Sequence, residues 1–137
     1  TGKMNFVARA LVGFGDVDPA GIVFYPRYFE MLNRAVEAWF ADGLGATFAS
    51  LHLDRKLGVP TVAIASTFTA PSRLGDELDI AIEVEKLGRT SCQVRYDVSC
   101  GEEARLSATG TLVCMDLTTH RPIPWPEDIR PGLFAAC

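Results

Sequence analysis

The 137-residue sequence has only two histidines and no concentration of positive charge. Its 13 lysines and arginines are scattered and are outnumbered by 17 acidic residues, which gives a formal net charge of −4. A nucleic-acid-binding domain normally has a clustered basic surface, so nucleic acid is not an expected partner. Apolar runs such as Val62–Ala65 are far shorter than the roughly 20 residues of a membrane span, so no membrane partner is expected either.

The cysteines are few and lack metal-site spacing. Their positions are Cys92, Cys100, Cys114 and Cys137. None forms the close pair typical of zinc or redox motifs, so we expect free thiols, a cytoplasmic location, and neither a metal nor a redox cofactor. Residues 1–12 lack the charged start and apolar run of a secretory signal, which agrees with that location.

The first third of the sequence predicts one strand followed by a long helix. With 48% hydrophobic and 22% charged residues and no internal linker, residues 1–137 are expected to form a single domain. Phe6–Val12 is apolar and predicts a strand. Between Tyr25 and Phe40 the apolar residues recur at helical spacing, which predicts an amphipathic helix with Pro26 in its first turn. A shorter helix is expected around Thr47–Leu57.

The remainder of the sequence has the period of β-strands. The predicted strands are Val62–Ala70, Leu78–Leu87, Arg89–Cys100 and Arg105–Leu117. Alternating apolar and polar residues in the second of these are typical of a sheet with one solvated face, and the short connections require antiparallel hairpins. We therefore predict an α+β fold in which a five-stranded antiparallel sheet wraps around the long central helix. Its open edges favour oligomerisation.

The segment Phe14–Tyr28 contains the most unusual pattern in the chain. It places two carboxylates, Asp16 and Asp18, in a glycine-bounded loop directly before the start of a helix. Unpaired N–H groups at a helix start can stabilise an oxyanion, and an aspartate beside them can act as nucleophile or base on an activated acyl group. The alternative is that both aspartates only cap turns. Spacing alone leaves both interpretations open.

This segment resembles the active-site motif of the 4-hydroxybenzoyl-CoA thioesterase family, whose members have the hotdog fold. The match runs from Asp18-Pro19-Ala20-Gly21-Ile22-Val23 through an aromatic residue to Tyr25-Pro26 and Tyr28, and the wider likeness covers Phe6 to Leu117. The resemblance implies an acyl-CoA thioesterase with Asp18 as nucleophile or general base. It also implies that the Tyr25 backbone N–H polarises the thioester carbonyl, while Asp16 serves the geometry of the loop.

The resemblance also implies a set of substrate-binding residues. These are Gly21, Val23, Phe24, Val59, Arg89 and Thr90. Arg89, in a glycine-containing turn, would hold the phosphates of coenzyme A, and its alternative role is that of a solvated turn residue. Departures from the aromatic-acyl members at Thr47, Phe48 and Val59 leave aromatic, short-chain and medium-chain acyl groups open. A related branch uses a helix glutamate, but with Asp18 present we expect Glu30 to be solvated or at an interface.

Two functions of different classes fit this sequence. The first is a thioesterase that hydrolyses an acyl-CoA to the free acid and CoA, with coenzyme A as part of the substrate and no cofactor. The second is a non-catalytic module that binds acyl-CoA or an acyl carrier, since fold alone does not define activity. Asp18 favours the first, because binding requires no carboxylate at the thioester. The resemblance further implies a homodimer or homotetramer whose active sites lie between subunits.

Overall fold

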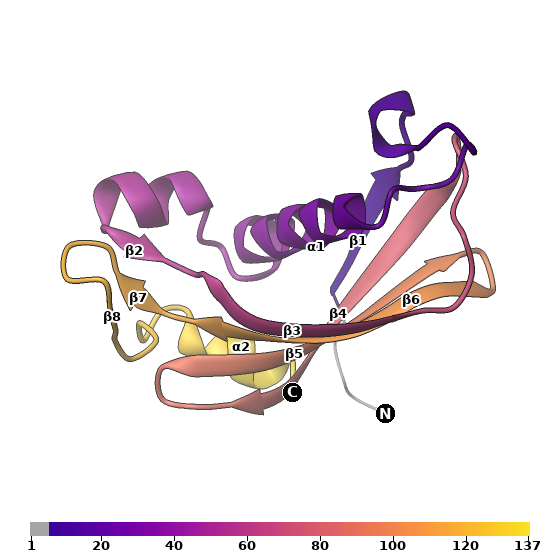
Figure 1. The fold of residues 1–137 in the computed structure, drawn as a ribbon. Coiled ribbons are helices and arrows are strands. Elements are labelled where there is room, and N and C mark those ends of the chain that lie inside the picture. The colour runs from indigo at the N-terminus through magenta and orange to yellow at the C-terminus, as the bar shows by residue number, and fades with distance from the viewer. Residues whose placement is uncertain (1–5) are drawn as a thin grey trace.

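The computed structural model describes residues 6–137 (Figure 1), so part of the N-terminal segment considered for a signal lies outside the described residues. In chain order the elements are β1 (Phe6–Leu11), the 3-10 turn η1 (Phe14–Asp16), α1 (Pro26–Ala38), the π-helical turns η2 (Trp39–Gly43) and η3 (Ser50–Asp54), β2 (Leu57–Gly58), β3 (Thr61–Phe68), β4 (Glu77–Leu87), β5 (Ser91–Cys100), β6 (Glu103–Val113), β7 (Met115–Asp116), β8 (Arg121–Pro122) and α2 (Arg130–Ala135).

Five strands form one antiparallel sheet in the order β1-β4-β5-β6-β3, and α1 lies along its concave side (Figure 1). Alternation explains the packing, because every second residue of β4 from Leu78 to Val84 points toward the helix and is buried. From α1, the buried face consists of Tyr28, Met31, Leu32, Ala35 and Val36. The predicted α+β arrangement of five strands around one long helix is confirmed. The hairpin expected between the strands at 62–70 and 78–87 is wrong, because β3 pairs with β6 and β4 pairs with β1 and β5.

The long helix begins and ends close to the predicted bounds. Pro26 occupies its first position, where a missing N–H costs no hydrogen bond. At its other end the helix widens into η2, and the Leu44 N–H donates to the Trp39 carbonyl at 3.0 Å. This wider turn keeps Trp39 and Phe40 buried in the core.

The second helix is shorter than predicted. The expected range Thr47–Leu57 is wrong at its end, because Lys56 has a φ of 54° and breaks the helical path. Leu57 then pairs with Asp116, so β2, β7 and β8 form a small sheet that was not predicted from the sequence. The last predicted strand is accordingly divided into β6 and β7.

The C-terminal helix α2 was also not predicted. Its Leu133 is fully buried, and Ile129 just before it has 2% exposure. Trp125 leads into this segment and contacts Phe40, with ring centroids 6.3 Å apart. The chain after β8 therefore extends the core at the end of α1. The helix was missed because Pro131 and Gly132 are unfavourable in helices.

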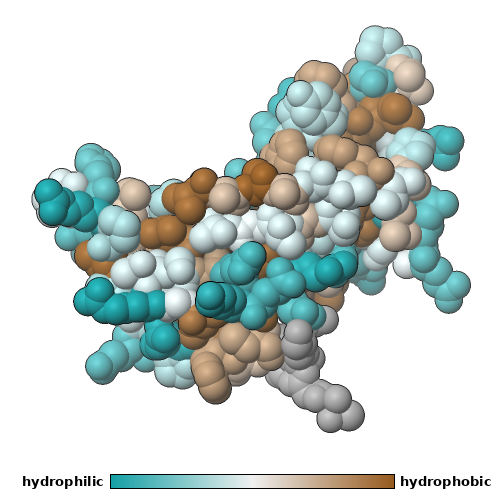
Figure 2. Space-filling model, turned by 60° about the horizontal axis from the view of Figure 1, so that its bottom comes forward, coloured by the Kyte–Doolittle hydropathy of each residue, from teal (hydrophilic) through white to brown (hydrophobic). Residues whose placement is uncertain are grey.

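The sheet has a polar outer face, and its edges are open. Figure 2 brings forward the side away from α1, where hydrophilic and neutral side chains occupy the centre and apolar groups lie toward the margins. At the β3 edge, Val62, Ile64 and Phe68 are 59%, 43% and 46% exposed. Ile64 and Phe68 pair with Gly110 and Leu106, so they face the helix side of the sheet. Within residues 6–137, no helix has the length and apolar character needed to span a bilayer.

Candidate active site

Asp18 lies in a tight turn of the loop before α1. The turn is closed by hydrogen bonds from the Asp18 N–H to the Ile22 carbonyl and from the Gly21 N–H to the Asp18 carbonyl, both 2.9 Å long. Gly21 has a φ of 80°, a conformation that favours glycine. The Ala20 N–H donates to Asp18 Oδ1 at 2.8 Å, whereas Oδ2 has no intramolecular partner among the described residues. One carboxylate oxygen is therefore held and the other is available.

Asp16 makes a different kind of contact. Its Oδ2 accepts the Gly13 N–H at 2.9 Å, and its carbonyl accepts the Phe24 N–H at 2.9 Å. Both bonds tie the two ends of the loop together. They agree with the structural role expected for Asp16.

Tyr25 stands at the N-cap of α1. Its carbonyl accepts the Tyr28 N–H at 3.1 Å, but its own N–H has no acceptor within the part of the chain that the structure describes. A helix start leaves such donors unpaired, and the helix dipole adds partial positive charge there. The Tyr25 amide is therefore free to bind an oxyanion.

A cavity of about 320 Å³ opens beside Tyr25. Its walls come from the loop, the first turn of α1, the end of β3 and the segment that follows it. The lining residues are Ile22, Val23, Tyr25, Tyr28, Phe68, Thr69, Ala70 and Pro71. The Phe68 ring lies 5.7 Å from the Tyr28 ring and 6.2 Å from the Tyr25 ring, so aromatic groups form much of the wall.

The predicted site residues are only partly gathered here. Val23 and Tyr25 line the cavity, while Asp18, Gly21 and Phe24 lie in the adjoining loop. Val59 packs against the core beyond β2, outside the cavity lining. Glu30, expected to be solvated, is exposed and pairs with Arg27 at 2.9 Å.

Arg89 and Thr90 lie at the opposite end of the sheet. The loop contacts Ser72 and Arg73 just before β4, whereas Arg89 follows the end of that strand. The 11 residues of β4 span about 35 Å at the usual rise per residue, so Arg89 and Asp18 of one chain lie far apart. Arg89 is exposed, and its carbonyl accepts the Trp125 N–H at 3.1 Å.

Several residues of the cavity were not singled out by the sequence analysis. Phe68 looked like an ordinary strand residue, and the segment 69–71 had no motif. Tyr28 was part of the quoted motif, but no role in the site was predicted for it. The segment after β3 joins the site through long-range contacts, which short sequence patterns do not reveal.

The fold and the loop together define a class of protein, a hotdog domain with a thioesterase-type site. The model of the thioesterase-like superfamily matches residues 12–133, and the chain belongs to this superfamily. The predicted family, fold and enzyme class, a thioester hydrolase, are thereby confirmed.

Curated relatives cover nearly the whole chain. The 1,4-dihydroxy-2-naphthoyl-CoA hydrolase of Synechococcus elongatus is 29% identical over 130 residues, which are 94% of this chain and 95% of the relative. The enzyme of the same name from Nostoc punctiforme is 26% identical over 129 residues, covering 92% of this chain and 84% of the relative.

Solved structures agree with this assignment. A gentisyl-coenzyme A thioesterase has a TM-score of 0.83 at 28% identity and covers 91% of this chain and 99% of its own. A 1,4-dihydroxy-2-naphthoyl-CoA thioesterase from Synechocystis has a TM-score of 0.86 at 21% identity, with 96% of each chain covered, and supports the fold alone.

Proposed function

We propose that the chain hydrolyses the CoA thioester of a hydroxylated aromatic acid to the free acid and CoA. The main support is the free Tyr25 amide beside a cavity that aromatic rings line, next to the turn that holds Asp18. Aromatic side chains favour an aromatic acyl group through edge-to-face and stacked contacts. Relatives named for dihydroxynaphthoyl and gentisyl thioesters support the same class of substrate.

In this proposal the reaction begins with the available oxygen of Asp18. As a nucleophile, Oδ2 attacks the thioester carbon, and the resulting oxyanion accepts the Tyr25 N–H. Collapse of the intermediate breaks the C–S bond and releases CoA thiolate, and water then hydrolyses the acyl-aspartyl anhydride. As a general base, Asp18 instead takes a proton from the water that attacks the same carbon. Both routes use the same two groups.

The remote position of Arg89 supports a site shared between two subunits. β3 is an edge strand, and β3 and β5 run in the same direction, so the turn containing Arg89 lies near the start of β3. Phe68 and the cavity lie at the other end of β3. Antiparallel pairing of two β3 edges about a two-fold axis places the start of one strand beside the end of the other.

This pairing brings Arg89 of the partner subunit toward the end of the sheet that carries Asp18. Its guanidinium can then bind the CoA phosphates while the acyl group occupies the cavity. Exposed Val62 and Ile64 become buried between the subunits, which removes an open apolar edge from water. We therefore propose a homodimer as the functional unit, which can associate further into a homotetramer.

The test is a panel of thioesters assayed by release of free thiol. It contains 1,4-dihydroxy-2-naphthoyl-CoA, gentisyl-CoA, 4-hydroxybenzoyl-CoA, benzoyl-CoA and hexanoyl-CoA. We expect kcat/KM for at least one hydroxylated aromatic substrate to exceed that for hexanoyl-CoA by about ten-fold or more, since each 1.4 kcal/mol of differential binding gives a factor of ten.

The other results have distinct meanings. Preference for hexanoyl-CoA would contradict the proposed substrate class. Binding of all five thioesters in calorimetry without release of thiol would support the non-catalytic acyl-CoA-binding alternative.

A further inference from the structure

Arg105 occupies an irregular position in the sheet. Val98 pairs with Leu106 and Ser99 pairs with Ala104, so Arg105 is an extra residue in the ladder between β5 and β6. Such a bulge changes the direction of a side chain and is frequent beside active sites. The Arg105 side chain is accordingly buried, with 9% exposure. Its neighbour Leu106 also faces the core, so regular alternation along β6 would place Arg105 on the solvated face.

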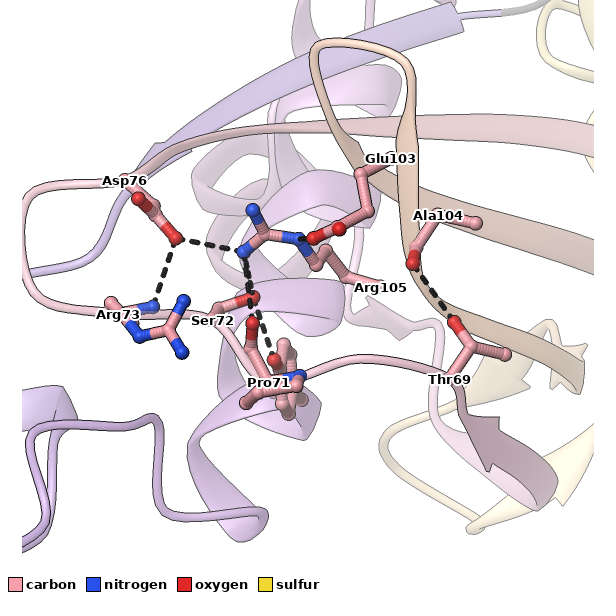
Figure 3. A network of polar contacts seen from close by, with 9 residues as sticks. Thr69, Pro71, Ser72, Arg73, Asp76, Glu103, Ala104 and Arg105 are labelled. Atoms are coloured by element: carbon pink, nitrogen blue, oxygen red, sulfur yellow. Dashed lines mark hydrogen bonds and ion pairs between the residues drawn. The ribbon is translucent and has the colours of Figure 1, made fainter.

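The guanidinium of Arg105 fixes the turn between β3 and β4 (Figure 3). Its Nη1 donates to Asp76 Oδ2 at 2.7 Å and to the Pro71 carbonyl and Ser72 Oγ at 3.1 Å each. Its Nε lies 2.6 Å from Glu103 Oε1, an ion pair whose angles fall outside those of a hydrogen bond. All three hydrogen bonds come from Nη1, at the far end of the guanidinium, while Nε pairs with Glu103. A lysine side chain is one bond shorter and has a single nitrogen, so it could not make both sets of contacts.

The backbone of Arg105 holds the cavity wall as well. Its carbonyl accepts the Thr69 N–H at 2.9 Å and the Ala70 N–H at 3.3 Å. Thr69, Ala70 and Pro71 all line the cavity. One residue thus contacts the wall through its main chain and the following turn through its side chain.

Ser72 transmits this arrangement to the loop and to α1. Its carbonyl accepts the Val23 N–H at 2.8 Å, and its Oγ accepts the Tyr28 hydroxyl at 2.8 Å. Ser72 is fully buried and Tyr28 has 3% exposure, so these bonds are shielded from water. Ile22 also pairs with Arg73. Arg105, Ser72 and Tyr28 therefore connect the sheet with both parts of the candidate active site.

We propose that Arg105 is a positioning residue for the thioesterase reaction, which fixes through Ser72 the placement of the Asp18 turn and the Tyr25 amide over the cavity. The inference rests on the proposed function for its catalytic consequence. A buried cation is costly to desolvate, and packing alone could be provided by an apolar side chain. Its hydrogen bonds to the wall and the turn instead maintain the geometry that an oxyanion site requires.

The experiment compares three variants of the full chain. Arg105→Lys keeps the charge, but its shorter side chain loses the contacts made by Nη1. Ser72→Ala removes the Oγ contacts while its backbone bond to Val23 remains. Arg95→Lys is the matched control, because Arg95 lies on the neighbouring strand and pairs with Asp97 on the exposed face. Steady-state kinetics use the best thioester of the panel, and hydrogen–deuterium exchange follows residues 17–25 and 91–100.

We expect Arg105→Lys to lower kcat by about ten-fold or more with KM changed less than about three-fold, since small displacements of reacting groups cost large factors in rate. Ser72→Ala should show the same pattern more weakly, and Arg95→Lys should match the unmodified protein. Exchange should rise in residues 17–25 of the first two variants and stay unchanged in residues 91–100.

Unchanged kcat in Arg105→Lys would overturn the proposal. So would a loss of kcat that matches the fraction of unfolded protein and is accompanied by faster exchange throughout the chain. If the unmodified protein hydrolyses no thioester of the panel, the proposed function fails, and exchange alone then decides the positioning role. Faster exchange confined to residues 17–25 supports that role, and unchanged exchange there refutes it.

Discussion

Asp16 and Asp18 are two residues apart, yet the loop uses them differently. Both oxygen contacts of Asp16 close the loop, whereas Asp18 keeps one carboxylate oxygen without an intramolecular partner. The turn-capping alternative therefore holds in part for Asp18, whose Oδ1 accepts the Ala20 N–H. Capping and catalysis do not exclude each other, because a carboxylate has two oxygens and capping fixes the direction of the second.

The first prediction separates these two roles. Asp18→Asn should fold normally, since the amide oxygen can still accept the Ala20 N–H, but it should lower kcat by about 10³-fold because an amide is neither nucleophile nor base. Asp16→Asn should cost much less activity. The measurements are kcat by thiol release and the midpoint of thermal unfolding. Equal losses of activity in the two variants at unchanged stability would contradict the assignment.

The second prediction concerns Arg89. Arg89→Ala should raise KM for CoA thioesters more than it lowers kcat, because a phosphate contact stabilises the bound substrate and the transition state alike. The effect should shrink at high salt, where exposed charges are screened. Arg121→Ala, which removes another exposed arginine, is the control. An unchanged KM at low ionic strength would make Arg89 a solvated turn residue.

At the scale of elements, the turn between β3 and β4 joins the sheet to the loop. Asp76 lies at its end, where Oδ2 accepts both the Arg105 guanidinium and the Arg73 N–H. These hydrogen bonds, that of Arg105 above all, hold the pKa of Asp76 below its usual value. The charged carboxylate therefore stabilises the turn, and its protonation weakens the turn.

The third prediction follows from this lowered pKa. The stabilisation by Asp76 should be complete at pH values above the usual carboxyl pKa of about 4 and should be lost as the pH falls through the lowered value. Asp76→Asn should thus reduce the free energy of unfolding by about 2 kcal/mol at pH 7, as expected for a charge-assisted hydrogen bond. Denaturant unfolding at pH 7, 5 and 3 measures the difference, which should narrow at the lowest pH. A constant difference would refute the role of the charge.

At the scale of the whole molecule, the proposed assembly depends on the open β3 edge. Its apolar residues face the side of the sheet that α1 covers elsewhere, yet they are about half exposed in the isolated chain. Burial of such residues against a second β3 removes apolar surface from water and pairs free backbone groups. In the proposed dimer, the same contact would bring the partner's Arg89 to the site.

The fourth prediction tests this assembly. Ile64→Lys should shift the protein from dimer to monomer in light scattering and should lower kcat/KM by about ten-fold or more, because a charge on the edge opposes pairing and separates the two halves of the site. Val7→Lys on the opposite edge strand, β1, is the matched control and should leave the β3 dimer intact. A monomer with full activity would defeat the shared-site proposal.

Much of the fold was predictable because its signals are local. Alternation in Leu78–Leu87 identified a half-buried strand. The apolar stripe between Tyr25 and Phe40 identified the helix against which this strand packs. Short connections correctly predicted the β4–β5 and β5–β6 hairpins, but the connection after β3 forms no hairpin, because β3 pairs with β6 at the far side of the sheet. α2 was missed since it has only six residues, including a proline and a glycine, and is stabilised by burial rather than by helix propensity.

The sequence by itself determined the loop motif from Asp18 to Tyr28, because turn, cap and helix start depend on neighbouring residues. Only the tertiary structure decided that Phe68 meets Tyr28, that Arg105 turns inward, and that Arg89 lies far from Asp18 in the same chain. These facts depend on strand register, on a bulge and on which ends of the strands coincide. Such relations join residues that are distant in sequence, and no local pattern of residues specifies them.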